Sequence, residues 1–458
     1  MALSFQISFL KGKDGFPLKR SIDRALLSWK NDPERLVLLV RGARQVGKTY
    51  SVRNLGSTFP RFLEINFEER SEVKSFFEGD LIVQDICEKL TAFFGVPLIP
   101  GESLLFFDEI QACPNCLRAL RFFHERMPGL HVVAAGSLLE FVLSEIPSFG
   151  VGRIQSIFMY PLSFGEFMGA EGSGALWEYA QNRKPGEPLD APVHEKITEK
   201  MRTYMLTGGM PAVVDRYTRN RDLRACQDLI GALLTTIFDD FSKYAHRIDP
   251  LVLRDTFRSV GSQAGGKFKY ASVGAGIPGR TAKAALDLLC RAGLVYRVFN
   301  TAARGIPLGA HKDHKRFKVI PLDIGIHQRM LGLSLPEMII ADPAKMVHRG
   351  HCAEIFAGLQ FIMESSPLLE PGLFYWHREA RDANAEVDYV IAQSDRIVPV
   401  EIKSGLRGSM QSMRLFLKER GLPMGVRLSA ENASRYNGIM SLPLYTAGRL
   451  VRDDCLTA

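Results

Sequence analysis

The sequence predicts an α/β protein whose first 170 residues form a parallel sheet. Apolar, strand-like runs alternate there with helical segments, a pattern typical of a parallel sheet with helices on both faces. One run, residues 36–40, leads directly into the octapeptide at 42–49, which fills the pattern G-x-x-x-x-G-K-[ST]. Another run, residues 103–107, ends in two acids, Asp108 and Glu109. Ligands of such sheets bind at the carboxyl ends of strands, where both features fall.

The elements of this region follow from the apolar spacing. The expected order is a strand at 36–40, a helix from 50, a strand at 62–67, a helix at 84–94, a strand at 103–107, a helix at 115–127 and strands at 131–137 and 156–162.

The octapeptide predicts a phosphate-binding loop. It consists of Gly42, Ala43, Arg44, Gln45, Val46, Gly47, Lys48 and Thr49. Glycines let successive backbone N–H groups point at phosphate oxygens, and the helix that follows adds its positive dipole end. We expect Lys48 to reach the β and γ phosphates and the Thr49 hydroxyl to ligate Mg²⁺. A glycine-bearing turn could match by chance, but the strand–loop–helix context favours a site for ATP and Mg²⁺.

The acids after the second apolar run predict hydrolysis as well as binding. An acid at the carboxyl end of a central strand holds magnesium in phosphate-loop enzymes, which is the role expected of Asp108. Glu109 beside it can orient and deprotonate the attacking water. An acidic exit from a strand is the plainer alternative. Because binding alone does not require Glu109, we interpret the chain as an ATPase.

Length and composition limit the other classes. The 458 residues suggest about three domains. No stretch reaches the roughly 18 uncharged apolar residues that a membrane span needs, and the segment 1–10 lacks the leading basic residues of a signal peptide. Seven scattered cysteines indicate reduced thiols, so we expect a cytoplasmic protein with no membrane association. Cys113 and Cys116 have zinc-knuckle spacing but no second pair, which argues against a zinc site.

Six segments in order carry a resemblance to a known family. They are Gly-Ala-Arg-Gln-Val-Gly-Lys-Thr at 42–49, Phe-Phe-Asp-Glu-Ile-Gln at 106–111, Ala-Ala-Gly-Ser-Leu-Leu-Glu-Phe at 134–141, Gly-Val-Gly-Arg at 150–153, Tyr-Pro-Leu-Ser-Phe-Gly-Glu-Phe at 160–167 and Gly-Gly-Met-Pro at 208–211. Over nearly its whole length the chain resembles AAA+-type P-loop ATPases of bacteria and archaea that carry a C-terminal domain of unknown function.

This resemblance implies three roles beyond the phosphate loop. Ser137 becomes a sensor residue that touches the γ-phosphate or the attacking water. Arg153 becomes an arginine finger that neutralises transition-state charge, although a solvated loop arginine fits equally well. A finger acts across a subunit boundary, so this role implies a homo-oligomer. The polar helical stretch with residues 208–211 becomes a lid over the nucleotide, although glycines before a proline also form an ordinary helix stop.

The basic excess of the chain lies in one segment. Residues 231–330 hold 16 Lys and Arg against seven Asp and Glu, a net charge of +9, whereas the whole chain carries +8. Helices expected at 251–263 and 279–292, followed by a strand at 294–299, have the order of a winged helix, with Arg280 and Lys283 at the start of the second helix. Concentrated positive charge on such a unit predicts contact with duplex DNA. Winged helices also dock proteins, which remains the alternative.

The last third contains a second group of chemical residues. Alternation places Val398, Val400 and Ile402 on one face of a strand, and Glu401 and Lys403 on the other.

Asp388 on the neighbouring strand could share a divalent ion with Glu401, with Lys403 beside it. An acid followed thirteen positions later by Glu-x-Lys is similar to the PD-(D/E)xK restriction-endonuclease-like superfamily, in which a helical glutamate completes the set. Glu354 takes that place. The plainer interpretation is a hairpin with charged residues on its wet face.

The predicted fold is therefore a P-loop AAA+ parallel sheet with a helical lid, then a winged helix, then a restriction-endonuclease-like α/β domain. The expected ranges are 1–170, 171–230, 231–335 and 336–458. We expect an ATPase that couples hydrolysis to DNA binding and to metal-dependent cleavage by the C-terminal domain. The alternatives are an ATPase that uses this domain only for docking, and a signalling or regulatory ATPase whose winged helix and C-terminal domain contact protein partners.

Overall fold

A computed structural model describes residues 18–137, 139, 152–245, 247–333, 350–379, 384–403 and 410–452. Several predictions fall outside these residues: the segment 1–10, parts of the motifs at 134–141 and 150–153, and the boundary at 335/336. Among the described residues, no helix is both long enough and apolar enough to cross a membrane.

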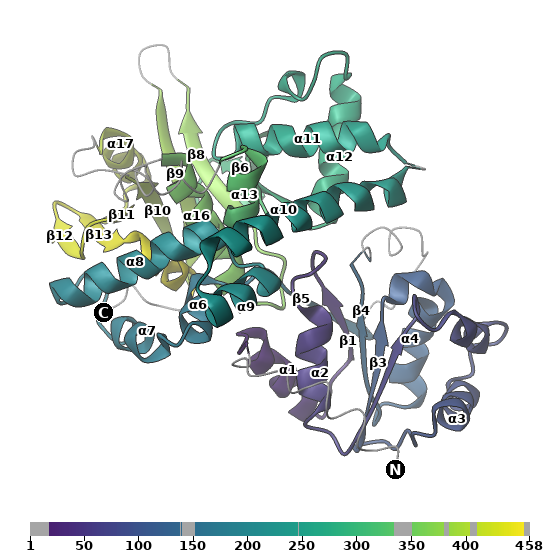
Figure 1. Cartoon of the computed structure of the whole chain (residues 1–458). Coiled ribbons are helices and arrows are strands. Elements are labelled where there is room, and N and C mark those ends of the chain that lie inside the picture. The colour runs from purple at the N-terminus through teal and green to yellow at the C-terminus, as the bar shows by residue number, and fades with distance from the viewer. Residues whose placement is uncertain are drawn as a thin grey trace.

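The N-terminal part is built on a five-stranded sheet, drawn in purple and blue in Figure 1. All its pairings are parallel, in the order β2-β3-β4-β1-β5. The strands are β1 (Val37–Arg41), β2 (Arg61–Asn66), β3 (Ser103–Asp108), β4 (His131–Ala135) and β5 (Ile154–Phe158). The accompanying helices are α1 (Ile22–Asn31), α2 (Lys48–Gly56), α3 (Val83–Phe94) and α4 (Pro114–Arg126). The predicted α/β fold with a parallel sheet is confirmed.

Both faces of this sheet are buried, which explains the continuous apolar runs in the sequence. On β1, Val37 and Leu39 belong to a core shared with α3 and α4. Leu38 and Val40 face the opposite way, into a core that also contains residues of α1 and α2 and extends into the rest of the chain. One face of this sheet is therefore packed against the same core that supports the later helices and the second sheet.

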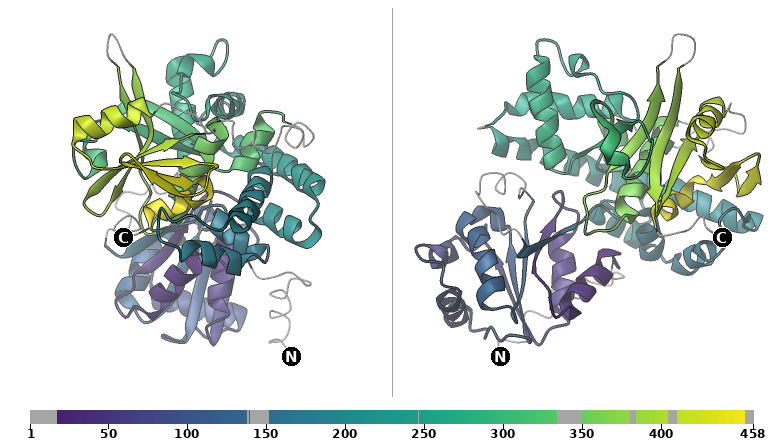
Figure 2. Two further views of the ribbon diagram at one scale, coloured as in Figure 1. Left: turned by 90° about the vertical axis from the view of Figure 1, so that its left-hand side faces the viewer. Right: turned by 180° about the vertical axis from the view of Figure 1, so that it is seen from behind.

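A helical region follows the first sheet. It comprises α6 (Phe164–Ala170), α7 (Gly174–Gln181), α8 (Ala191–Thr207), α9 (Pro211–Asn220) and α10 (Leu223–Asp240). Helix α10 runs without a break across the predicted boundary at 230/231, and these helices lie between the two sheets and beside the second one in both views of Figure 2. The range predicted to form a lid and the basic segment are therefore joined by a continuous helix.

The basic segment contains its predicted elements in the predicted order. These are α11 (Pro250–Gln263), α12 (Gly279–Arg291), β6 (Val295–Thr301) and β7 (Lys312–Pro321), followed by α13 (Ile324–Met330). The hairpin of β6 and β7 does not stand alone, since β6 also pairs in parallel with β8 (Leu373–Arg378). The hairpin expected to form a wing is thus part of the C-terminal sheet.

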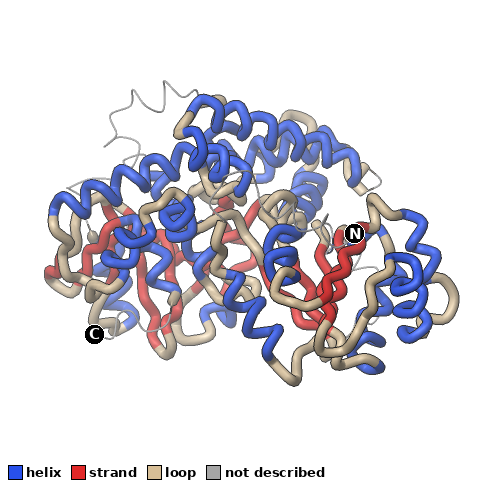
Figure 3. The backbone as a smooth tube through the Cα atoms, turned by 60° about the horizontal axis from the view of Figure 1, so that its bottom comes forward, coloured by secondary structure: helices blue, strands red, loops and turns tan. Residues whose placement is uncertain are grey.

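That second sheet is mixed and has eight strands in the order β12-β13-β11-β10-β9-β8-β6-β7. Its remaining strands are β9 (Ala385–Gln393), β10 (Arg396–Ile402), β11 (Gly425–Ser429), β12 (Ser434–Tyr436) and β13 (Ile439–Pro443). Helices α16 (Gly350–Glu364) and α17 (Gln411–Arg420) accompany it. Figure 3 shows the two groups of strands in red with helices alongside each. The four predicted domain ranges stay a prediction. The second sheet combines strands from the last two of these ranges.

Short 3₁₀ helices connect several of these elements: η2 (Ser71–Phe77), η3 (Ile110–Ala112), η4 (Phe241–Tyr244), η5 (Tyr270–Ser272), η6 (Leu308–His311) and η7 (Leu444–Val451).

The turn between α8 and α9 connects the first sheet to the basic segment. The backbone N–H of Gly209 donates to Oδ2 of the buried Asp323 at 2.6 Å, and its carbonyl accepts from the N–H of Leu162 at 2.7 Å. A Cβ at position 209 would lie 2.1 Å from the carbonyl oxygen of Leu162.

We expect Gly209→Ala to lower the free energy of unfolding by about 2–3 kcal/mol, because backbone must move to admit the methyl group. The matched control is Gly169→Ala in helix α6, where an added Cβ meets nothing within 4 Å. That change should leave stability unchanged or raise it by about 0.5–1 kcal/mol. Equal melting temperatures for the two variants would contradict this account of the turn.

Candidate functional site

The phosphate-binding loop connects the interior strand β1 to helix α2. Gly42 has a φ of 145°, and a Cβ there would lie 2.2 Å from the carbonyl oxygen of Met159, so only glycine fits. Helix α2 starts at Lys48, which directs its N-terminal N–H groups toward the loop. The local geometry is that of an anion cradle.

Lys48 is 7% exposed, and its Nζ donates to the carbonyl oxygens of Gly42 and Ala43 at 2.9 and 2.8 Å. Burial lowers the pKa of Lys48 to about 8, although the charges of Glu109 and Asp108 act in the other direction. The ammonium is thus held by carbonyls of the loop itself, at the base of the site where a phosphate would need a counter-charge.

Thr49 and Asp108 lie side by side, which is the arrangement expected of a magnesium site. The Thr49 hydroxyl donates to Oδ2 of Asp108 at 2.9 Å, and Asp108 is 4% exposed at the end of β3. Burial raises the pKa of Asp108 to about 6, against the hydrogen bond from Thr49. A hydroxyl and a carboxylate side by side are hard oxygen donors that fit Mg²⁺.

Glu109 follows directly and has a left-handed backbone, with a φ of 47°. Such conformations cost of order 1 kcal/mol and often occur at functional sites. Its Oε2 accepts a hydrogen bond of 2.5 Å from Nε2 of Gln111, and a Cβ on Gly136 would collide with Oε1 of that glutamine. Gln111 therefore fixes the direction of the Glu109 carboxylate.

Ser137 lies just after β4, the strand between β1 and β3, so it faces the space between the loop and Asp108. Its Oγ accepts a hydrogen bond of 3.1 Å from Nε of Arg44. The same guanidinium donates from NH1 to both carboxylate oxygens of Asp240, at 2.9 and 3.0 Å. Asp240 is the last residue of α10. A residue of the phosphate loop is therefore paired with the helix that leads to the basic segment.

Arg153 lies near the amino-terminal end of β1, whereas the phosphate loop follows the carboxyl end of that strand. It precedes β5, and its carbonyl accepts from the N–H of Val37, the first residue of β1. A five-residue strand separates the two ends by roughly 13–17 Å. The Arg153 side chain is half exposed and pairs with Glu125 at 3.0 Å. Because Arg153 lies at the opposite end of β1 from the phosphate loop of its own subunit, a finger role requires a second subunit.

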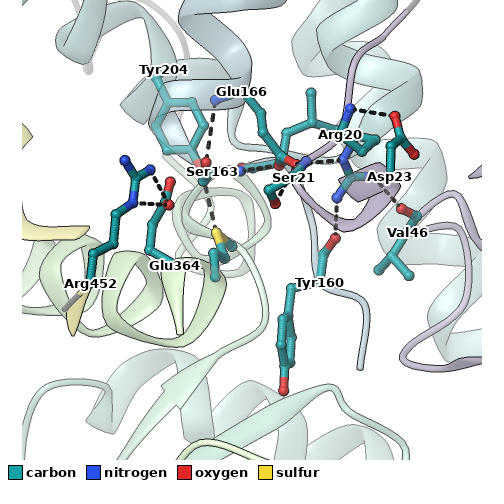
Figure 4. A network of polar contacts seen from close by, with 12 residues as sticks. Arg20, Ser21, Asp23, Val46, Tyr160, Ser163, Glu166, Tyr204, Glu364 and Arg452 are labelled. Carbon is teal, nitrogen blue, oxygen red and sulfur yellow. Dashed lines mark hydrogen bonds and ion pairs between the residues drawn. The ribbon is translucent and has the colours of Figure 1, made fainter. Parts of the chain in front are cut away.

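Figure 4 shows a polar network, centred on Arg20, that supports the phosphate loop from behind. The buried Arg20 guanidinium donates to the carbonyl oxygens of Val46 and Tyr160, at 2.9 and 2.7 Å, and to Oε1 of Glu166 at 3.1 Å. Glu166 also forms a capping box with Ser163 at the start of α6. The network joins the loop to the start of the helical region.

Arg280 and Lys283 lie exposed on α12, whose apolar side is buried. The turn after α12 reaches the phosphate loop: a Cβ on Gly293 would lie 3.3 Å from the backbone nitrogen of Ala43. The predicted DNA-contacting helix therefore ends directly against the nucleotide site.

Three of the predicted C-terminal site residues, Asp388, Glu401 and Lys403, lie close together. Asp388 on β9 accepts a hydrogen bond of 2.7 Å from the N–H of Ile402, and Lys403 pairs with Oε1 of Glu401 at 2.6 Å. Glu401 is 5% exposed, and within the described part of the chain its Oε2 has no hydrogen-bond partner. Burial raises the pKa of Glu401, and the charge of Asp388 raises it further. Asp388 and Glu401 thus face a common space, as predicted.

Glu354 differs from the prediction. It lies on α16, but its Oε1 pairs at 2.6 Å with Nζ of Lys318, which is also 2.6 Å from Oε1 of Glu386. Burial alone would lower the pKa of Lys318, but the charges of Glu354, Asp388 and Glu386 raise it above its usual range. Among the described residues, no group of three or more His, Cys, Asp or Glu is arranged to hold a metal ion. The predicted three-carboxylate metal site is therefore not assembled.

Cys113 and Cys116 are buried, and the cysteines of the described ranges are free thiols.

Sequence analysis missed Arg20, Gln111, Asp240 and Lys318. For Lys318 a signal existed, since it interrupts a buried apolar strand that continues through 319–320. Gln111 stands within a quoted motif. Arg20 and Asp240 carry no local pattern, because the partners Val46 and Arg44 are 26 and 196 residues away in the sequence.

Comparison with known proteins assigns a class to the N-terminal part. Residues 34–168 match a family described as an AAA domain. Two further segments, 198–337 and 349–446, match domains of unknown function (DUF8612 and DUF4143). A search of curated protein sequences gave no match.

Several solved structures are similar at low sequence identity. A Walker-type ATPase of Pyrococcus abyssi is 16% identical, with 70% of this chain and 99% of that chain covered and a TM-score of 0.44. The ORC1 protein of Aeropyrum pernix, solved in complex with DNA, is 14% identical, with 70% and 95% covered and a TM-score of 0.31. A signal transduction ATPase with numerous domains from Pyrococcus horikoshii is 11% identical, with 75% and 48% covered and a TM-score of 0.28.

Fold, loop and family match together place residues 34–168 in the P-loop ATPase class. More narrowly, this segment is similar to proteins of a family described as an AAA domain.

The site geometry predicts separable effects of three substitutions. Lys48→Ala should abolish ATP binding, because it removes the charge facing the phosphates. Glu109→Gln should retain ATP binding and lower turnover at least about 100-fold, as expected for loss of a general base. Gln111→Leu should give an intermediate loss of turnover with unchanged affinity, because it frees the Glu109 carboxylate. Binding is measured with a fluorescent ATP analogue and turnover by phosphate release. A Glu109→Gln variant that hydrolyses ATP at the wild-type rate would contradict the assignment of the base.

Proposed function

We propose that the protein is an ATPase whose nucleotide state controls its binding to duplex DNA. The observation that carries this proposal is the packing of the phosphate loop against the basic segment at two adjacent residues. Arg44 pairs with Asp240, and Ala43 lies against Gly293. A phosphate that binds in the loop must therefore change the geometry of both contacts.

Hydrolysis follows from the groups around the loop. Loop N–H groups and Lys48 bind the β and γ phosphates, and Glu109, oriented by Gln111, accepts a proton from the attacking water. Thr49 and Asp108 would hold Mg²⁺, which when bound neutralises charge on the phosphates. Ser137 contacts the γ-phosphate or the attacking water from β4.

Arg44 provides the link to the nucleotide state. Its guanidinium binds Ser137 and Asp240 at once, so a γ-phosphate near Ser137 competes for the same positive charge. Release of Asp240 frees the end of α10. Beyond it, Phe241 of η4 packs edge-on against Phe257 of α11, with ring centroids 6.1 Å apart. Helix α11 packs on α12, which carries the basic residues.

Duplex DNA is the proposed partner of α12. The segment carries a net charge of +9, and Arg280 and Lys283 are exposed at the first turns of the helix. Positive charge at an exposed helix suits phosphate contacts, which make affinity dependent on salt. A second basic group, Lys312, Lys315 and Arg316, is exposed on β7.

We expect the double variant Arg280→Ala, Lys283→Ala to weaken duplex binding and to flatten the plot of log affinity against log salt by about two units, one for each lost phosphate contact. The control is Lys89→Ala, Arg121→Ala, which removes the same charge from exposed positions on α3 and α4. Fluorescence anisotropy at several salt concentrations measures both.

An unchanged slope in the α12 variant would move the interface to the basic group on β7. A wild-type protein that shows no salt-dependent binding of DNA would instead support a signalling ATPase with protein partners.

A homo-oligomer is proposed from Arg153. This arginine lies at the edge of the sheet away from its own loop, so it can complete an ATP site only in a neighbouring subunit.

A second proposed activity is metal-dependent DNA cleavage by the C-terminal domain. The observation in its favour is the buried Oε2 of Glu401, which lacks a hydrogen-bond partner among the described residues and lies beside Asp388. Two adjacent carboxylates fit Mg²⁺ or Mn²⁺ as oxygen donors. Lys403, paired with Glu401, is placed to orient water or to steady a phosphodiester.

We expect Glu401→Gln or Asp388→Ala to abolish Mn²⁺-dependent nicking of supercoiled DNA while ATP hydrolysis persists. Asp395→Asn, in the exposed turn between β9 and β10, is the control that should cleave normally. Wild-type protein that cleaves neither linear, supercoiled nor branched DNA with Mn²⁺ would leave this domain as a docking surface.

A further inference from the structure

Lys318 occupies an unusual place for a lysine. It lies on strand β7 between the buried residues Phe317 and Val319, and its side chain is only 3% exposed. A buried ammonium costs several kcal/mol unless it is closely paired. The surroundings of Lys318 must therefore compensate its charge.

Two carboxylates surround this ammonium. Nζ of Lys318 is 2.6 Å from Oε1 of Glu354 and 2.6 Å from Oε1 of Glu386. It also lies 5.2 Å from the centre of the Tyr375 ring, within the range of a cation–π contact. These partners come from α16, β9 and β8, so a single charge joins three elements to the hairpin of the basic segment.

The position resembles that of a bound metal ion. A carboxylate pair around one cation is the arrangement in which proteins hold divalent ions, and enzymes that cut phosphodiesters often use two such ions side by side. Glu386 and Asp388 are two residues apart on β9, so they share one face of that strand. Asp388 accepts a hydrogen bond from the N–H of Ile402, the residue after Glu401, so the pair around Lys318 adjoins the carboxylates of Asp388 and Glu401.

We propose that the Lys318 ammonium is a built-in cation that takes the place of a second divalent ion in the C-terminal cluster. Glu354 and Glu386 are paired with this ammonium, and among the described residues of the cluster Asp388 and Glu401 are left to bind an exchangeable cation. This proposal depends on the proposed C-terminal function only in expecting a divalent ion at Asp388 and Glu401.

Titration of the full-length protein with Mn²⁺, followed by the paramagnetic resonance of free Mn²⁺ with EDTA-treated protein and no ATP, tests this directly. Relative to wild type, Lys318→Met should gain one Mn²⁺ site per chain, because it vacates a carboxylate pair. Lys318→Met combined with Glu386→Gln should lose the gained site. Lys315→Met, an exposed change on the same strand, should bind as wild type does. An unchanged stoichiometry in Lys318→Met would overturn the proposal.

A variant that does not fold is also informative. If Lys318→Met is unfolded by circular dichroism, the charge-cancelling variant Lys318→Met, Glu354→Gln, Glu386→Gln should restore a folded protein with a melting temperature near that of wild type. Failure to restore it would mean that the lysine serves packing rather than charge, and would overturn the proposal.

The neighbouring site is tested separately. Glu401→Gln should remove the wild-type Mn²⁺ site and leave the site gained by Lys318→Met. If wild type lacks a site at Glu401 and Lys318→Met still gains one, the proposed cleavage activity fails while the role of Lys318 stands.

Discussion

Three residues that are distant in the sequence pack against the phosphate loop, and the proposed coupling of the parts depends on these contacts. Arg20 binds the carbonyl of Val46, and Asp240 binds Arg44. Gly293 lies against Ala43. We propose that a loop that closes on phosphate oxygens alters these contacts, so that ATP binding at the first sheet changes the packing of the basic segment. Ligands act at a distance when they favour one arrangement of such contacts over another.

The first sheet could be predicted because its information is local. The strand ending in Asp108 and the glycines around Lys48 can each be recognised from a few neighbouring residues. In the structure the Thr49 hydroxyl donates a hydrogen bond to Asp108. The second sheet could not be predicted in this way. The pairing of β6 with β8 joins segments more than 70 residues apart, and no periodicity in either strand identifies its neighbour. For the same reason a hairpin that was expected to form a separate wing is part of an eight-stranded sheet.

Charge pairing explains the remaining difference at Glu354. From the sequence alone, a helical glutamate near Asp388 and Glu401 is expected to be a metal ligand, because the residue that pairs with it cannot be identified. That partner, Lys318, lies on a strand assigned to another domain, and it contacts Glu354 only because β7 belongs to the same sheet as β9. The continuous sheet thus brings Lys318 to Glu354 and joins the basic segment to the C-terminal part.

The most direct test of the central claim is duplex affinity with and without ATP, measured by anisotropy in a Glu109→Gln background that prevents turnover. ATP should change the affinity several-fold when Asp240 is present. Asp240→Asn should remove this change, because Arg44 loses its charged partner on α10, whereas Asp239→Asn, an exposed neighbour, should retain it. A response to ATP that persists unchanged in Asp240→Asn would contradict the account.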